Sequence, residues 1–123
     1  MGKRKILLVE DEKDLVETLA FRLKAEDYEV IKAYDGQEGL DKAHSEVPDL
    51  IILDLMLPKL DGYKVCRMLK FDNKYKNIPI ILFTARAQES DKKLGEEVGA
   101  DAFISKPFEP QILLAKIKEL IKD

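Results

Sequence analysis

Several features are scarce or missing in this 123-residue sequence, and each absence excludes a class of protein. The single cysteine, Cys66, rules out an internal disulfide and fits a reducing compartment such as the cytoplasm. No apolar run exceeds a few residues, whereas a membrane-spanning helix needs about 20, so we expect no membrane association. The net charge of -3 shows none of the basic excess of nucleic-acid-binding proteins, so we expect no direct nucleic-acid contact.

Nucleotide-binding motifs and internal repeats are also missing. The sequence contains no Gly-x-Gly-x-x-Gly or Walker pattern and no linker or low-complexity segment. Its composition is typical of a globular protein with a charged surface, since 46% of the residues are hydrophobic and 37% are charged. A chain of this length buries most of its apolar surface around one core, so we expect a single domain over residues 1–123.

Short apolar segments alternate with amphipathic helical patterns along the whole chain. The expected strands are residues 6–9, 28–33, 50–53, 78–83 and 102–104. The helix after the first strand shows the i, i+3, i+4, i+7 spacing of one buried face, with Val16, Leu19, Ala20 and Leu23. Strands that alternate with helices indicate βαβ units with right-handed crossovers. We therefore predict an α/β fold, a single doubly wound domain whose five-stranded parallel sheet has helices on both faces.

Two of the later helices have distinguishing features. Asp61 stands where one of them should begin and is expected to cap it. The expected inner face of that helix comprises Val65, Met68 and Leu69. The segment Glu89–Val98 is the weakest helix, because it has few apolar residues and because Gly95 costs about 1 kcal/mol relative to Ala. We expect this helix to be the mobile one.

Polar side chains follow four of the predicted strands. They are Glu10 and Asp11 after the first, Asp54 after the third, Thr84 after the fourth and Lys106 after the fifth. Taken alone, Asp54 is more simply explained as the first polar residue of a loop. The carboxyl ends of parallel strands share one edge of the sheet, however, and open α/β sheets bind their ligands there. We therefore expect these side chains to form one site.

Three clustered carboxylates need cations, because two unit charges 4 Å apart interact by roughly 4 kcal/mol at an effective dielectric near 20. Lys106 supplies one cation. Only oxygen donors cluster here, with no second cysteine and with the lone His44 on a helix face, so Mg²⁺ fits the site and Zn²⁺ does not. This set suits phosphoryl transfer, with Asp54 attacking phosphorus while the cations and the Thr84 hydroxyl stabilise the phosphoryl oxygens.

The motifs at these strand ends resemble those of the receiver domains of two-component response regulators, which have the chemotaxis-regulator-like fold. They are Val9-Glu10-Asp11-Glu12, Leu53-Asp54-Leu55-Met56-Leu57-Pro58 with Asp61-Gly62, Phe83-Thr84-Ala85, and Gly99-Ala100-Asp101 running to Lys106-Pro107-Phe108. Each motif alone is weak, but all four in order at the proper strand ends are highly specific. The resemblance covers essentially the whole chain and implies the strand order 2-1-3-4-5 and a cis peptide bond before Pro107.

The resemblance also implies a role for each residue of the expected site. Asp54 is the phosphoacceptor, which takes a phosphoryl group from the phosphohistidine of a sensor histidine kinase. Thr84 and Lys106 contact the phosphoryl oxygens. The groups that position Mg²⁺ are Glu10, Asp11, Asp54 and the Met56 carbonyl. Such a domain catalyses its own phosphorylation and dephosphorylation without being a conventional enzyme.

Phe103 occupies the position of the family's switch aromatic, which is more often Tyr. We hypothesise that phosphorylation draws Thr84 inward and lets Phe103 swing in. This change would bias the surface shared by the weak helix, the last strand and the last helix. The alternative is a Phe103 that is permanently part of the core, because Phe lacks the hydroxyl that would hold an outward state.

The output partner is expected to be a downstream protein or a phosphotransferase. The runs Asp54–Pro58 and Phe83–Arg86 resemble receivers of winged-helix transcription factors. Ala102 and Lys116 stand where that subfamily usually has the Asp and Arg of its dimer contact, and no output domain follows Asp123, so we expect a free-standing receiver. A receiver fragment of such a transcription factor and a phosphorylation-independent binding scaffold are the alternatives.

Overall fold

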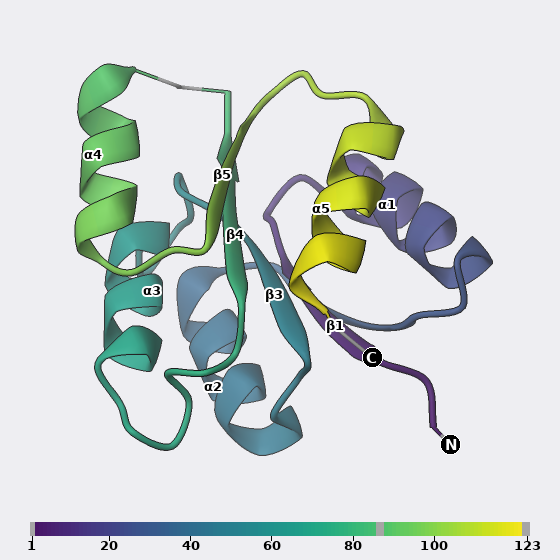
Figure 1. Ribbon diagram of the computed structural model, residues 1–123, viewed down its shortest axis with the longest axis horizontal. Coiled ribbons are helices and arrows are strands. Elements are labelled where there is room, and N and C mark those ends of the chain that lie inside the picture. Colours follow the sequence, from purple (N-terminus) through teal and green to yellow (C-terminus); the bar gives the residue numbers. More distant parts are fainter. Residues whose placement is uncertain (1, 86–87, 122–123) are drawn as a thin grey trace.

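The computed structural model describes residues 2–85 and 88–121, and Arg86 of the predicted motif lies outside the described residues. Strands and helices alternate along the described chain, as predicted (Figure 1). The strands are β1 (Lys5–Val9), β2 (Glu29–Ala33), β3 (Leu50–Asp54), β4 (Ile80–Thr84) and β5 (Ala102–Ser105). The helices are α1 (Lys13–Ala25), α2 (Gly36–Glu46), α3 (Gly62–Lys70), α4 (Glu89–Glu97) and α5 (Pro110–Leu120).

The strands form one parallel sheet in the order β2-β1-β3-β4-β5, which confirms the predicted doubly wound α/β fold. The chain passes from β1 to the outer strand β2 and returns to place β3 on the other side of β1. The register pairs Val9 with Leu53 and Asp54 with Phe83. The carboxyl ends of β1, β3 and β4 therefore lie together at one edge, beside the point where the strand order reverses.

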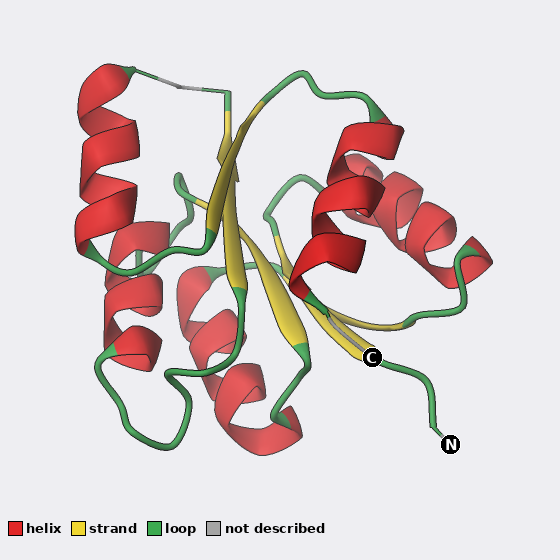
Figure 2. Cartoon of the chain, in the orientation of Figure 1, coloured by secondary structure: helices red, strands yellow, loops and turns green. Residues whose placement is uncertain are grey.

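Successive side chains of a strand point to opposite faces, so the sheet separates two hydrophobic cores. Figure 2 shows the strands between two groups of helices. We call one side the α2–α4 core, which α2, α3 and the end of α4 cover; its strand residues include Leu7, Val9, Ile51, Leu53, Ile80 and Leu82. The α1–α5 core lies on the other face under α1 and α5; its strand residues include Ile6, Leu8, Leu50, Ile52, Ile81 and Phe83.

The helical patterns predicted most of the buried faces. All four expected residues of α1 are buried, and Asp61 caps α3 by accepting a hydrogen bond from the Lys64 N–H at 3.0 Å. The prediction for Met68 is wrong, since 51% of its surface is exposed. Cys66 is fully buried instead, because Gly62, Val65, Cys66 and Leu69 have the i, i+3, i+4, i+7 spacing of one helix face and Met68 lies outside it.

Gly95 allows α4 to pack closely on the sheet. A Cβ atom at this position would lie 3.3 Å from Leu82 Cδ1 and 3.3 Å from the Phe103 ring. The glycine that weakens α4 as a helix therefore brings it against β4 and β5. None of the helices in the described part of the chain combines the length and the apolar character needed to cross a membrane.

Candidate functional site

The structure brings the predicted site residues to one edge of the sheet. Asp54 is the last residue of β3 and Thr84 the last of β4, and both side chains are buried. Glu10 directly follows β1, and its backbone N–H donates to the Ala33 carbonyl at 3.0 Å, which continues the β1–β2 ladder past the strand end. Lys106 follows β5 and is held by its N–H, which donates to the Thr84 carbonyl at 2.8 Å.

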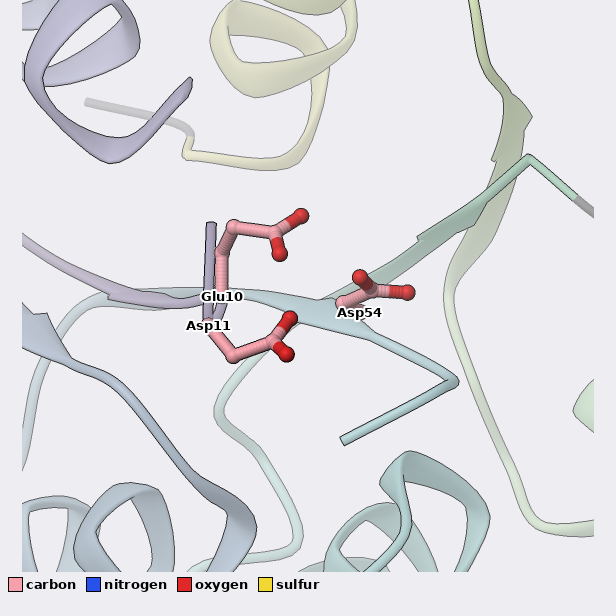
Figure 3. Close-up of side chains that lie close together, drawn as sticks. All are labelled: Glu10, Asp11 and Asp54. Atoms are coloured by element: carbon pink, nitrogen blue, oxygen red, sulfur yellow. The ribbon is translucent and has the colours of Figure 1, made fainter. Parts of the chain in front are cut away.

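Three carboxylates meet at this edge. One oxygen of each of Glu10, Asp11 and Asp54 lies within 4.8 Å of the others. Figure 3 shows their side chains gathered at the ends of β1 and β3. Glu10 and Asp54 are buried, whereas Asp11 is exposed. An all-oxygen donor set open to solvent on one side fits Mg²⁺, which keeps several of its waters when it binds to one or two carboxylates.

Lys106 pairs with both buried acids. Its Nζ lies 2.6 Å from Glu10 Oε1 and 3.2 Å from Asp54 Oδ2, and it stands 4.7 Å from the centroid of the Phe83 ring. Burial alone would lower the pKa of Lys106, but the hydrogen bond to Glu10 and the charges of Asp54 and Glu10 outweigh it, so the pKa is raised. The peptide bond to Pro107 is cis, as the resemblance implied.

The neighbouring carboxyl group of Glu10 shifts the pKa of Asp11. Its hydrogen bond with the Glu10 carboxyl raises the pKa of Asp11, and desolvation and the Glu10 charge act in the same direction. A raised pKa means that the ionised form of Asp11 is less favourable here than it is in water. The single ammonium of Lys106 therefore leaves part of the repulsion in this cluster uncompensated.

The backbone around Asp54 is fixed by a tight contact with the start of α3. The Met56 N–H donates to Asp54 Oδ1 at 3.1 Å, and the Gly62 N–H donates to the Leu55 carbonyl at 3.0 Å. A Cβ atom on Gly62 would lie only 2.3 Å from the Asp54 carbonyl oxygen. The Asp61-Gly62 pair thus combines a helix cap with the one residue type that can approach the Asp54 strand end so closely.

The two predicted switch residues lie on neighbouring strands. Thr84 pairs with Ser105 across the β4–β5 ladder, and Phe103 pairs with Leu82. Phe103 is half-buried and packs against the α2–α4 core beside Gly95. Its position next to α4 is the one the switch hypothesis requires, and the movement itself stays a prediction.

An apolar hollow that the sequence did not reveal adjoins the site. It has a volume of about 390 Å³ and lies between the first half of α1 and the segment that joins β5 to α5. Its lining includes Leu15, Leu19, Ala85, Phe108 and Pro110. Periodicity identified Leu19 as a core residue, but only the assembled fold shows that the β5–α5 segment leaves space above it.

Comparison with known proteins identifies the family. The model of the response regulator receiver domain family matches residues 6–118, which is most of the chain. This chain belongs to that family. Receiver domains of two-component systems accept phosphoryl groups from sensor histidine kinases and bind Mg²⁺ at an acidic pocket.

The receiver domain is similar to proteins from several microorganisms. It is 46% identical over 119 residues to the alkaline phosphatase synthesis transcriptional regulatory protein PhoP of Bacillus subtilis, covering 97% of this chain and 49% of that protein. The chain thus spans about half the length of this curated relative.

Solved structures of receivers superpose closely on it. A CheY-like receiver domain protein from Methanospirillum hungatei matches with a TM-score of 0.92 and 31% identity, covering 98% of this chain and 94% of that one. The BeF3-activated N-terminal receiver domain of RstA from Klebsiella pneumoniae matches with a TM-score of 0.90 and 32% identity, covering 98% of this chain and 100% of that one.

Proposed function

We propose that this receiver domain takes a phosphoryl group onto Asp54 from the phosphohistidine of a sensor histidine kinase in the cytoplasm. The observation that carries the proposal is the pairing of a buried aspartate at the end of the central strand with Lys106, inside a cluster of three carboxylates. An aspartate in this position is reachable from the carboxyl edge of the sheet and has a cation ready beside it.

In the proposed reaction an oxygen of Asp54 forms a bond to phosphorus while the phosphorus–nitrogen bond of the phosphohistidine breaks. The electron pair of that bond returns to the imidazole nitrogen. Lys106, whose Nζ already lies 3.2 Å from Asp54 Oδ2, attracts the charge on the phosphoryl oxygens. The Thr84 hydroxyl, on the adjacent strand, donates a hydrogen bond to one of them.

Mg²⁺ would complete the charge balance of the site. The groups proposed to hold it are the Glu10, Asp11 and Asp54 carboxylates and the Met56 carbonyl. When bound, it supplies the positive charge that offsets the three acids and the incoming phosphoryl group. In the proposed reverse step, water attacks phosphorus, the bond between phosphorus and the Asp54 oxygen breaks, and the Asp54 carboxylate is restored. The substrate of this step is the domain's own aspartyl phosphate.

The proposed output is a change at the surface formed by α4, β5 and α5. Thr84 moves toward the phosphoryl group, and Phe103, whose ring lies against Gly95 of α4, swings into the space that Thr84 leaves and shifts α4. A free-standing receiver would present this surface to a downstream protein or a phosphotransferase. The Bacillus subtilis relative, a transcriptional regulatory protein about twice as long, favours the second candidate, a receiver that acts within a transcription factor.

The test of phosphorylation is intact mass after incubation with phosphoramidate or acetyl phosphate, with Mg²⁺ and with EDTA. We expect a gain of one phosphoryl group that needs Mg²⁺ and is absent from Asp54→Asn. A folded protein that gains no mass under any condition would contradict the proposal and favour the phosphorylation-independent scaffold.

The two outputs are separated by sedimentation at several concentrations, with and without beryllofluoride, an inorganic mimic of the phosphoryl group. A receiver that stays monomeric supports the free-standing role. A tight dimer that forms only with the mimic supports the transcription-factor role, because paired receivers bring two output domains together.

A further inference from the structure

A second buried carboxylate, outside the phosphorylation site, connects α3 to α4. Asp91 lies in the first turn of α4 and is only 5% exposed. The Tyr63 hydroxyl, at the start of α3, lies 3.1 Å from Asp91 Oδ1 and 3.0 Å from the Asp91 carbonyl oxygen. A buried carboxylate requires such donors, so this contact fixes the first turn of α4 relative to α3.

The same carboxylate also holds the residue that precedes α4. Asp91 Oδ2 accepts a hydrogen bond from the Gln88 N–H at 3.2 Å. Gln88 is the N-cap of α4, and in the sequence only residues 85–87 separate it from Thr84. Asp91 therefore restrains Gln88 at the start of α4, the helix that is proposed to move on phosphorylation.

The other end of this connection is anchored at the phosphoacceptor. Tyr63 follows Gly62, whose N–H binds the Leu55 carbonyl and whose Cα packs against the Asp54 carbonyl. Gly62, the residue before Tyr63, is thus held against the strand end that carries Asp54. A short path of contacts thus runs from Asp54 through Tyr63 to Asp91.

We propose that Tyr63 is a positioning residue, which acts through Asp91 to hold the start of α4 in its present position and so opposes uptake of a phosphoryl group at Asp54, which is proposed to shift α4. This inference rests on the proposed function. Loss of the Tyr63 hydroxyl removes a hydrogen bond that favours the present position of α4. A hydrogen bond made more strongly in one of two states shifts the equilibrium toward that state.

The Tyr63→Phe variant tests the proposal, because it keeps the ring and removes only the hydroxyl. We expect it to bind beryllofluoride in the presence of Mg²⁺ about threefold to tenfold more tightly than the native chain, as the loss of one hydrogen bond of typical net strength implies. The measurement is isothermal titration calorimetry. The matched control is Tyr75→Phe, which removes a hydroxyl from a tyrosine packed on the α2–α4 core and should leave the affinity unchanged.

A double-mutant cycle separates positioning through Asp91 from a general loss of rigidity. If Tyr63 acts through the Asp91 side chain, adding Tyr63→Phe to Asp91→Ala, which removes the carboxylate but keeps the backbone carbonyl acceptor, raises the affinity by a smaller factor than adding it to the native chain. Additive effects in the cycle, or a Tyr63→Phe affinity equal to or weaker than the native one, would overturn the proposal.

Hydrogen exchange of the unliganded protein gives a readout that does not depend on phosphorylation or on the folding of Asp91→Ala. We expect faster exchange of the amides from Gln88 to Lys92 in Tyr63→Phe, and unchanged exchange would overturn the proposal. A native chain that fails to bind beryllofluoride contradicts the proposed function instead, and the exchange data then decide whether Tyr63 restrains α4.

Discussion

Lys106 offsets the buried acids of the site, so its removal should have a large and specific effect. In Lys106→Met the Glu10 and Asp54 carboxylates keep their burial and lose their cation. We expect a loss of about 3 kcal/mol in the free energy of unfolding at pH 7, measured by urea denaturation. Because Mg²⁺ can replace the missing charge, it should stabilise this variant more than the native chain.

The matched control is Lys116→Met, which removes an exposed pair with Glu119 and should cost under about 1 kcal/mol. The raised pKa of Lys106 also sets a pH window. The contribution of Lys106 to the free energy of unfolding is fully present below the ordinary lysine pKa of 10.5. It is lost as the pH rises through the raised pKa of the folded protein. A Lys106→Met cost equal to that of the control would contradict the role of Lys106.

Cys66 should be unreactive until the protein opens. Burial raises the pKa of its thiol from 9.0 to about 12, so the reactive thiolate is about a thousandfold scarcer than in the unfolded chain. We expect an aromatic disulfide reagent at pH 8 to label the native protein at least about a thousandfold more slowly than the protein in urea. Rapid native labelling would show that α3 opens easily from the sheet.

The positions of the site residues were the part of the site most accessible to sequence. Acids and a lysine that follow apolar runs must share an edge once the strands are parallel, and this logic placed Glu10, Asp54 and Lys106 correctly. It gave no indication of Tyr63 or Asp91, because both lie within helical patterns that look like ordinary surface positions. Their contact depends on how α3 and α4 lie against each other, which periodicity does not encode.

At the level of the elements, the start of α3 depends on a glycine. In Gly62→Ala the new Cβ meets the Asp54 carbonyl and the Leu55 Cα, and neither backbone group can move aside like a flexible side chain. We expect a loss of about 3 kcal/mol in the free energy of unfolding by urea denaturation, as for an overpacked core. Gly2→Ala is the control, since nothing lies within 4 Å of that position. Equal stability of the two variants would show that α3 can shift freely.

Helix and strand patterns predicted the elements well and their inner faces less well. The i, i+3, i+4 spacing of α1 identified all four of its buried residues, because that helix has one clear apolar face. In α3 the apolar residues spread around the helix, so Met68 was assigned to the wrong face and Cys66 replaced it. Gly95 was recognised as a cost to α4, whereas its benefit, the approach to Phe103, needs the neighbouring strand to be known.

At the scale of the whole molecule, the sheet separates the two cores. A substitution in one core should therefore change the free energy of unfolding independently of a substitution in the other. Val65→Ala leaves a cavity in the α2–α4 core, and Ile117→Ala leaves a cavity in the α1–α5 core. We expect their losses of stability to add within about 0.5 kcal/mol in the double variant. The pair Val65→Ala and Leu69→Ala, within one core, serves as the comparison and should depart from additivity.

The separation of the cores has a consequence for how such a domain diversifies. Lys106 and the apolar hollow beside it lie on the α1–α5 side, whereas Phe103, Tyr63 and Asp91 lie toward α3 and α4. Substitutions that accumulate among the residues lining the hollow can therefore leave the contact between Tyr63 and Asp91 intact. The two faces of this small fold can then diverge independently of each other in evolution.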